Sequence, residues 1–171
     1  QVPLTTDSMR LPAYLAVNHY DFDYLTEAEG ARTTGDLFSR APGQVGTGVE
    51  FDAGEAAQGH GSLRFMSGGT GVTVGPGVTL NPTGSFGIST FVRLDQAAAQ
   101  TIVSKQGAYE LRTVLVGGEA RVEFSVMNGG NRRSVVSSDA LPIGEWRHVS
   151  VRLDNGYLLV HLGEEGIVNS G

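Results

Sequence analysis

Three carboxylates lie close together in the segment Glu50-Phe51-Asp52-Ala53-Gly54-Glu55, with the spacing E-x-D-x-x-E. Glycoside hydrolysis needs two carboxyl groups at a fixed separation, one as an acid and one as a nucleophile or base. However, Ala53-Gly54 inside the triplet and the stretch Ala56–Gly59 after it are typical of a loop, which does not hold two carboxyls at a fixed distance. We therefore interpret the triplet as an acidic loop and expect no catalytic residues.

The sequence shows no motif for a transition-metal site, a serine nucleophile or a phosphate-binding loop. The four histidines show neither the H-x-x-H nor the H-E-x-x-H spacing of transition-metal sites. No serine belongs to a G-x-S-x-G elbow, and the glycine-rich stretch from Gly68 to Gly77 precedes a predicted strand, whereas a phosphate cradle opens a helix. Arg132-Arg133, after the turn Asn128–Asn131, forms a small basic spot, which is either a solvated loop or the contact of an anionic partner. The histidines are His19, His60, His148 and His161.

The composition bounds the class of protein. The 171 residues are 40% hydrophobic and 18% charged, with a formal net charge of -6 and no cysteine. This hydrophobic share is too high for a disordered chain, and no apolar run is long enough for a transmembrane segment. The acidic balance disfavours nucleic-acid binding, which needs a basic surface. Gln1 in place of an initiator Met, the lack of cysteine and a single lysine, Lys105, favour an exported bacterial protein, periplasmic or secreted.

Short segments that alternate apolar and polar residues follow one another along the chain, separated by glycine-rich turns. This period of two is typical of half-buried strands. In the first such segment, Tyr20, Phe22 and Tyr24 share one face, and the turn Asp154-Asn155-Gly156 predicts a hairpin. No stretch has a convincing helical period. Further alternating segments cover residues 63–65, 86–93, 109–115, 122–126, 149–153 and 158–162.

Many short strands, regular turn signals and no helices predict an all-β fold, an antiparallel sandwich of two sheets. Residues 1–18 are interpreted as an N-terminal extension and residues 19–171 as one domain. Within it, residues 26–61 contain glycine, alanine, threonine and acidic residues without a stable period. We interpret that stretch as a long loop excursion between the first and second strands.

Two longer segments carry more than a generic strand pattern. Residues 80–94 read LNPTGSFGISTFVRL, and residues 141–153 read LPIGEWRHVSVRL. They resemble the FTISAWVRL and LPLGEWHHVAVTYD segments of laminin-G-like, concanavalin A-type jelly rolls. Gly61–Phe65 and Ile102–Lys105 are similar to the GALRFDG and TIVSK strands of the same family. The order and spacing match from about residue 60 to 160, and the resemblance implies a jelly-roll sandwich.

The resemblance also suggests roles for the carboxylates. Some glucanases of this superfamily carry an E-x-D-x-x-E triplet on a bulged cleft strand, which would make Glu50 the nucleophile and Glu55 the acid/base. Here the triplet precedes the second predicted strand, and a chain with one Trp has few rings to stack on sugars. The resemblance further implies calcium at one rim of the sandwich. Asp21, Asp23 and Asp36 are the candidate ligands; alternatively, the first two form the solvated face of an edge strand.

The end of the resembling region departs from the family. The LYVNG strand appears as Leu159–Gly163 without its Asn-Gly, and the closing IDEVRIYN strand has no counterpart before Gly171. A sheet without its closing strand leaves backbone groups unpaired along an edge. We therefore expect the Tyr157–Leu162 strand to pair with a partner or with a C-terminal extension.

These observations favour a non-catalytic, extracytoplasmic interaction module that docks a protein partner, in the role of a peripheral subunit of a larger envelope or membrane complex. The alternative is a carbohydrate-binding module with Phe91 or an exposed Tyr as the stacking platform, and a glucanase ranks third. The low aromatic content places protein docking above sugar binding. The candidate ligand-binding residues are Phe91, Arg93, Arg132 and Arg133; no cofactor other than calcium is expected.

Overall fold

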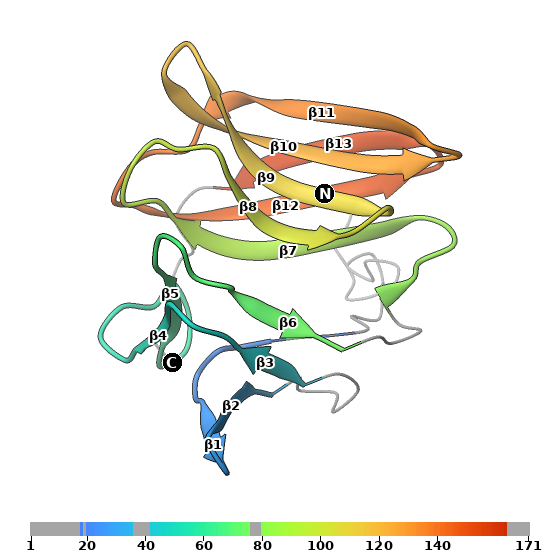
Figure 1. Ribbon diagram of the computed structural model, residues 1–171. Helices are drawn as coiled ribbons and strands as arrows, with labels where there is room; N and C mark the ends of the chain where they lie inside the picture. The colour runs from blue at the N-terminus through green and yellow to red at the C-terminus, as the bar shows by residue number, and fades with distance from the viewer. Residues whose placement is uncertain (1–17, 19, 36–41, 76–79, 164–171) are drawn as a thin grey trace, which may run out of the picture. The chain divides into compact units, whose positions relative to one another are not determined.

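The computed structural model describes residues 18, 20–35, 42–75 and 80–163, and these residues form strands joined by turns and loops (Figure 1). The predicted all-β class is confirmed. The chain divides between Asn81 and Pro82 into two compact units. Each unit has its own sheets and is described here by itself.

The C-terminal unit is a sandwich of two antiparallel sheets. Sheet I has the strand order β11-β10-β9-β8, and sheet II has the order β13-β12-β7 (Figure 1). Sequence neighbours are hydrogen-bonded neighbours in sheet I, whereas β7 joins sheet II through a crossover. The strands are β7 (Phe86–Arg93), β8 (Gln100–Lys105), β9 (Tyr109–Val116), β10 (Glu119–Asn128), β11 (Asn131–Ala140), β12 (Trp146–Asp154) and β13 (Tyr157–Gly163).

The alternation in the sequence explains how the two sheets pack. Phe124 of β10 and Leu111 of β9 are fully buried, and they meet Val149 and Val151 of β12 across the layer. The Phe86 ring contacts Phe124 edge to face, with ring centroids 6.0 Å apart. Because successive side chains point to opposite faces of a strand, the intervening polar residues form two outer faces, one on each sheet.

Glycine and asparagine supply the backbone angles of three hairpins in the C-terminal unit. Gly117-Gly118 joins β9 to β10, and Gly129-Gly130 joins β10 to β11, with φ between 57° and 90° at all four residues. The predicted Asn155-Gly156 turn joins β12 to β13 with φ of 47° and 84°. Positive φ at both central residues matches the right-handed twist of the flanking strands.

The N-terminal unit consists of short strands in two small sheets. One sheet has the order β1-β2-β3-β6, and β4 pairs with β5 in the other. The strands are β1 (Thr26–Ala28), β2 (Ala31–Thr34), β3 (Gly43–Val45), β4 (Val49–Asp52), β5 (Ser62–Phe65) and β6 (Val72–Val74).

Two predictions for the N-terminal unit were wrong. Residues 20–25 were expected to form the first strand, but they are irregular, and Phe22 has a φ of 58° that breaks the extended backbone. Residues 26–61 were expected to be a loop excursion, but they contain β1 to β4. β1 to β4 have only three or four residues each, and their alternation does not stand out from the surrounding glycine, threonine and acidic residues.

The domain boundaries stay a prediction in part. Most of the proposed extension, residues 1–18, lies outside the described residues. The proposal of one domain over residues 19–171 stays a prediction beside the division into two units.

Candidate functional site on the outer faces of the sandwich

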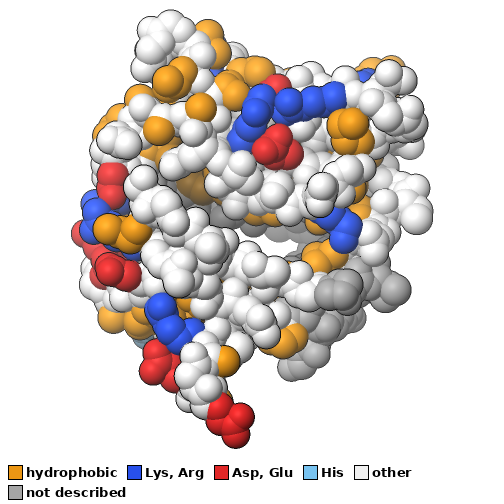
Figure 2. Space-filling model, in the orientation of Figure 1, with side chains coloured by type: hydrophobic (Ala, Val, Ile, Leu, Met, Phe, Trp, Pro, Cys, Tyr) orange, Lys and Arg blue, Asp and Glu red, His pale blue; other side chains and the backbone are white. Residues whose placement is uncertain are grey.

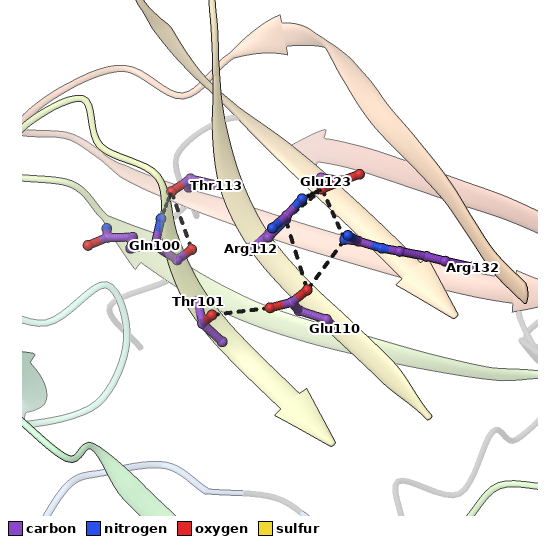
Figure 3. A network of polar contacts seen from close by, with 7 residues as sticks. All are labelled: Gln100, Thr101, Glu110, Arg112, Thr113, Glu123 and Arg132. Carbon is purple, nitrogen blue, oxygen red and sulfur yellow. Dashed lines mark hydrogen bonds and ion pairs between the residues drawn. The ribbon is translucent and has the colours of Figure 1, made fainter. Parts of the chain in front are cut away.

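The outer face of sheet I carries a closed group of charged side chains from three strands. The register pairs Glu123 of β10 with Arg112 of β9 and with Val136 of β11. One step along the sheet, Glu110 lies opposite Ser125, and Arg132 lies opposite Met127. We call Glu110, Arg112, Glu123 and Arg132 the charge network (Figure 3).

Each cation of the charge network contacts both of its carboxylates. Arg112 donates from Nε to Glu123 at 2.6 Å and has Glu110 3.9 Å away. Arg132 donates from Nη2 to Glu123 at 3.2 Å and to Glu110 at 3.3 Å. Thr101 of β8 donates to the other oxygen of Glu110 at 3.2 Å, so the group spans all four strands of sheet I (Figure 3). Opposite charges therefore offset one another within this face.

Glu123 is the least exposed member, with 11% of its side chain accessible. Burial alone would raise the pKa of Glu123. The hydrogen bonds from Arg112 and Ser134 and the charges of Arg112 and Arg132 outweigh burial, and they hold the pKa of Glu123 below its ordinary value. The carboxylate is thus ionised at neutral pH and stabilises both guanidinium groups.

We predict that Glu123→Gln lowers the free energy of unfolding by about 1–2 kcal/mol at neutral pH, because it removes a charge-assisted partner from two arginines. A carboxyl whose pKa is depressed in the folded state stabilises the fold above its unfolded pKa, and this stabilisation disappears as the pH falls through the folded pKa. The difference between wild type and variant should therefore shrink on acidification below about pH 4. Denaturant unfolding at several pH values measures it.

The matched control for this prediction is Glu119→Gln. Glu119 pairs with Arg121 on the same strand but is mostly exposed, so its loss should cost under about 1 kcal/mol. An equal effect of Glu123→Gln at acidic and neutral pH would show that charge plays no part at Glu123.

The two arginines of the predicted basic spot lie in different surroundings. Arg132 and Arg133 lie on β11 and not in a loop, because the hairpin turn ends at Gly130. Arg132 is held in the charge network. Arg133 pairs with Val126, so it lies on the opposite face at the rim of the sandwich, where it is exposed. Basic and acidic side chains lie next to one another on the face seen in Figure 2 and do not form a patch of one sign.

The outer face of sheet II has a different character. The register places His148 of β12 beside Phe91 of β7, and their rings are in tilted contact with centroids 5.0 Å apart. The Nε2 atom of His148 lies 2.7 Å from the Ser89 hydroxyl, at hydrogen-bond distance. Trp146 and Arg93 form the next pair along the same two strands. Trp146 and His148 therefore lie on the same face of β12.

Trp146 is half-buried on this face. Its indole nitrogen is buried and has no hydrogen-bond partner among the described residues. We predict that Trp146→Ala costs about 2 kcal/mol, less than the roughly 3–5 kcal/mol of a fully buried tryptophan. Trp146→Phe should cost under about 1 kcal/mol, because it retains the ring and removes an unsatisfied donor.

The fluorescence of the single tryptophan supports a direct test. Emission should lie to the blue of free indole in water, since the indole nitrogen is shielded. An emission maximum equal to that of free indole, or a larger loss of stability in Trp146→Phe than in Trp146→Ala, would contradict this description.

The strongest exposure of apolar side chains lies on the β13 side of this face. Tyr157 is 73% exposed and Leu159 is 46% exposed. Both alternate with the inward-facing Leu158 and Val160, and Leu159 pairs with Arg152 of β12. Arg152 forms an ion pair with Asp154 at 3.2 Å. An aromatic ring, an aliphatic side chain and an arginine thus adjoin on one open surface.

The four predicted ligand-binding residues are not brought together. Phe91 and Arg93 lie on β7 in sheet II, whereas Arg132 and Arg133 lie on β11 in sheet I. Sequence reasoning missed the charge network and the Tyr157–Leu159 surface. Part of the signal for the network was available, because Glu110, Arg112 and Glu123 alternate with apolar residues, but the pairing of the strands was needed to join them with Arg132.

The predicted calcium ligands have other roles or lie outside the description. Asp36 is outside the described residues. Asp23 accepts the backbone N–H of His60 at 2.6 Å and thereby joins residues 20–25 to the turn at Gly59. The described residues contain no group of three or more histidines and carboxylates placed to hold a metal ion. Calcium binding stays a prediction.

The carboxylate triplet is split between a strand and a turn. Glu50 lies on β4 opposite Arg64, and Asp52 ends the strand. The Asp52 carboxylate accepts the Gly54 N–H at 2.9 Å, which closes a turn before Glu55. A side-chain bond to its own turn is the role that aspartate commonly has at a strand end.

A sandwich of two antiparallel sheets with polar and apolar side chains on its outer faces is the architecture of a β-sandwich binding module. A family model described as the concanavalin A-like lectin/glucanases superfamily matches residues 66–162, more than half of the chain. The chain therefore belongs to this superfamily, as a laminin-G-like domain. Searches of curated proteins and of solved structures returned no significant match.

Proposed function

We propose that this protein is a non-catalytic, extracytoplasmic interaction module that docks a protein partner, as a peripheral subunit of an envelope or membrane complex. Laminin-G-like domains are usually extracellular, which supports the location. No helix in the described part of the chain has the length and apolar character of a membrane span.

The contrast between the two outer faces carries this proposal. The charged groups of sheet I satisfy one another in the charge network. Sheet II exposes Tyr157 and Leu159 beside Arg152, and both are more exposed than Met127 and Val136 on the outer face of sheet I. Tyrosine and arginine are enriched at protein interfaces, where large side chains fill pockets of the partner. The β13 side of sheet II is therefore the docking surface.

The acidic triplet supports the choice of a binding function over a glucanase. A glycosidase holds its two carboxyls at a fixed separation across a cleft. Here the Asp52 carboxylate is bound to its own turn, and a turn separates Glu55 from Glu50. Glu50→Gln and Glu55→Gln are expected to leave the biological activity unchanged.

Site-specific photo-crosslinking in the native host tests the docking surface. A photoreactive amino acid at Tyr157 should yield a discrete crosslinked protein that mass spectrometry identifies. The matched control places it at Val136, a side chain of similar exposure (42%) on the outer face of β11. Crosslinks at Val136 but not at Tyr157 would assign docking to sheet I and refute the proposal.

Carbohydrate binding is the second candidate, and the Phe91–His148 contact favours it. An aromatic ring beside a Ser–His hydrogen-bonding pair has the two elements of a sugar site, a stacking surface and polar groups. A glycan array decides between the two functions. Specific binding that is lost in Phe91→Ala would place the glycan function first.

A further inference from the structure

Two histidines share the outer face of sheet II with the docking surface. The register pairs His161 of β13 with Ser150 of β12, and His148 of β12 with Gly163 of β13. The two imidazole side chains therefore start from diagonal positions on neighbouring strands. His161 is exposed and follows the exposed Leu159 by one step on the same face of β13. A partner that covers the docking surface thus also meets this pair of histidines.

His148 is held on one side and uncovered on the other. On the β7 side, its Nε2 atom lies 2.7 Å from the Ser89 hydroxyl, and its ring contacts Phe91. On the β13 side, its neighbour is Gly163, where an added Cβ would lie 3.4 Å from Nδ1 of His148. A side chain at this position would cover that nitrogen, whereas glycine leaves it uncovered on the side of the docking surface.

Arginines are the fixed charges nearest to the two histidines on this face. Arg93 lies one same-face step beyond the row of His148, and Arg152 lies one step beyond the row of His161, about 7 Å in each case. Asp154 lies two steps, about 13 Å, from the row of His161 and is paired with Arg152 at 3.2 Å. A proton on either histidine therefore adds positive charge near arginines, without a nearby carboxylate from the described strands of this face. The charged and titratable side chains that β7, β12 and β13 place on this face beside the histidines are Arg93, Arg152, Asp154 and Tyr157.

We propose that His148 and His161 make docking depend on pH, an inference that rests on the proposed docking function. Histidine is the side chain whose charge changes between about pH 5 and pH 8. A partner with an apolar, uncharged contact surface covers neutral imidazoles at little cost, but covering a charged imidazole without a counter-charge is costly. Docking and protonation therefore oppose each other. The partner binds at neutral pH and is released on acidification.

A titration with a photoreactive chain tests this dependence. The purified chain, with a photoreactive amino acid at Tyr157, is added at increasing concentration to envelopes isolated from the native host. The concentration that gives half-maximal crosslinking is measured at about pH 7.5 and at about pH 5.5. Each histidine that must be neutral raises this concentration by up to about tenfold per pH unit. We expect a rise of about tenfold or more at the lower pH.

Three variants assign the response to the two histidines. The double variant His148→Gln/His161→Gln has uncharged side chains at both pH values, so its half-maximal concentration should change by under about twofold. His161→Gln alone changes an exposed position and should retain part of the response. The matched control is His60→Gln, which replaces an exposed histidine of the N-terminal unit and should respond to pH like the wild type.

The outcomes separate this inference from the docking function itself. Equal crosslinking of the wild type at both pH values would leave docking in place and overturn the pH dependence. A double variant that keeps the wild-type response would assign the titrating group to the partner, which also overturns the inference. Crosslinks that are absent from Tyr157 at both pH values would refute the docking surface, and the inference with it.

Discussion

Replacing Phe124 by alanine is expected to lower the free energy of unfolding of the C-terminal unit by about 3–5 kcal/mol, the range for a large aromatic residue in a packed core. Phe124 is 0% exposed and lies at the centre of the core that joins the two sheets. Its loss removes contacts with Phe86 as well as with the valines of β12, and the strands around it cannot close the cavity without breaking their register. Chemical denaturation followed by circular dichroism measures the change.

The control for this prediction is Met127→Ala. Met127 lies three residues further along the same strand but is exposed, so its loss should change stability by under about 0.5 kcal/mol. A cost of under about 1 kcal/mol at Phe124 would mean that the two sheets do not share this core. Because both outer faces depend on that core, Phe124→Ala should also weaken every binding activity together.

Replacing Gly48 by alanine is expected to destabilise the N-terminal unit by about 2–4 kcal/mol, through strain and through steric overlap. Gly48 has a φ of 67°, a conformation that alanine adopts only at a cost. An added Cβ would lie 2.7 Å from the Cα of Gly69, which is backbone and cannot rotate away. The carbonyl of Gly48 also accepts the Met66 N–H, so any shift breaks a hydrogen bond.

The control variant Gly68→Ala separates the two contributions. Gly68 has a similar φ of 77°, but an added Cβ there meets nothing within 4 Å. It should therefore cost only the backbone strain, about 1 kcal/mol. Hydrogen exchange of β3 to β6 measures both variants, and equal effects at Gly48 and Gly68 would show that the close approach of Gly69 does not matter.

The two outer faces of the sandwich differ in how their charged side chains are arranged. In the charge network of sheet I, Glu110 and Glu123 each contact an arginine on a neighbouring strand. On the β13 side of sheet II, the exposed Tyr157 and Leu159 are large and uncharged, and the neighbouring Arg152 is paired with Asp154. Covering the β13 side would therefore bury Arg152 together with its partner Asp154, and Arg152 would not be buried as an unpaired charge.

The sequence alone determined the all-β class, the sandwich and the hairpins of the C-terminal unit. These follow from local physics: alternation over eight to ten residues specifies which face of a strand is buried, and Asn155-Gly156 or Gly117-Gly118 supplies positive φ. The same reasoning failed at residues 20–34. There Phe22 adopts a left-handed φ and Asp23 bonds to His60, a residue far along the chain.

Only the tertiary structure decided which polar residues act together. Arg132 was identified from sequence as part of a basic spot, but its charge is neutralised by Glu110 and Glu123 from two other strands. Phe91 and Arg133 were both candidate ligand-binding residues, and they lie on different sheets. A strand pattern specifies which face a residue occupies, whereas its neighbours on that face come from strand order and register. Those are set by long-range packing, which no local pattern records.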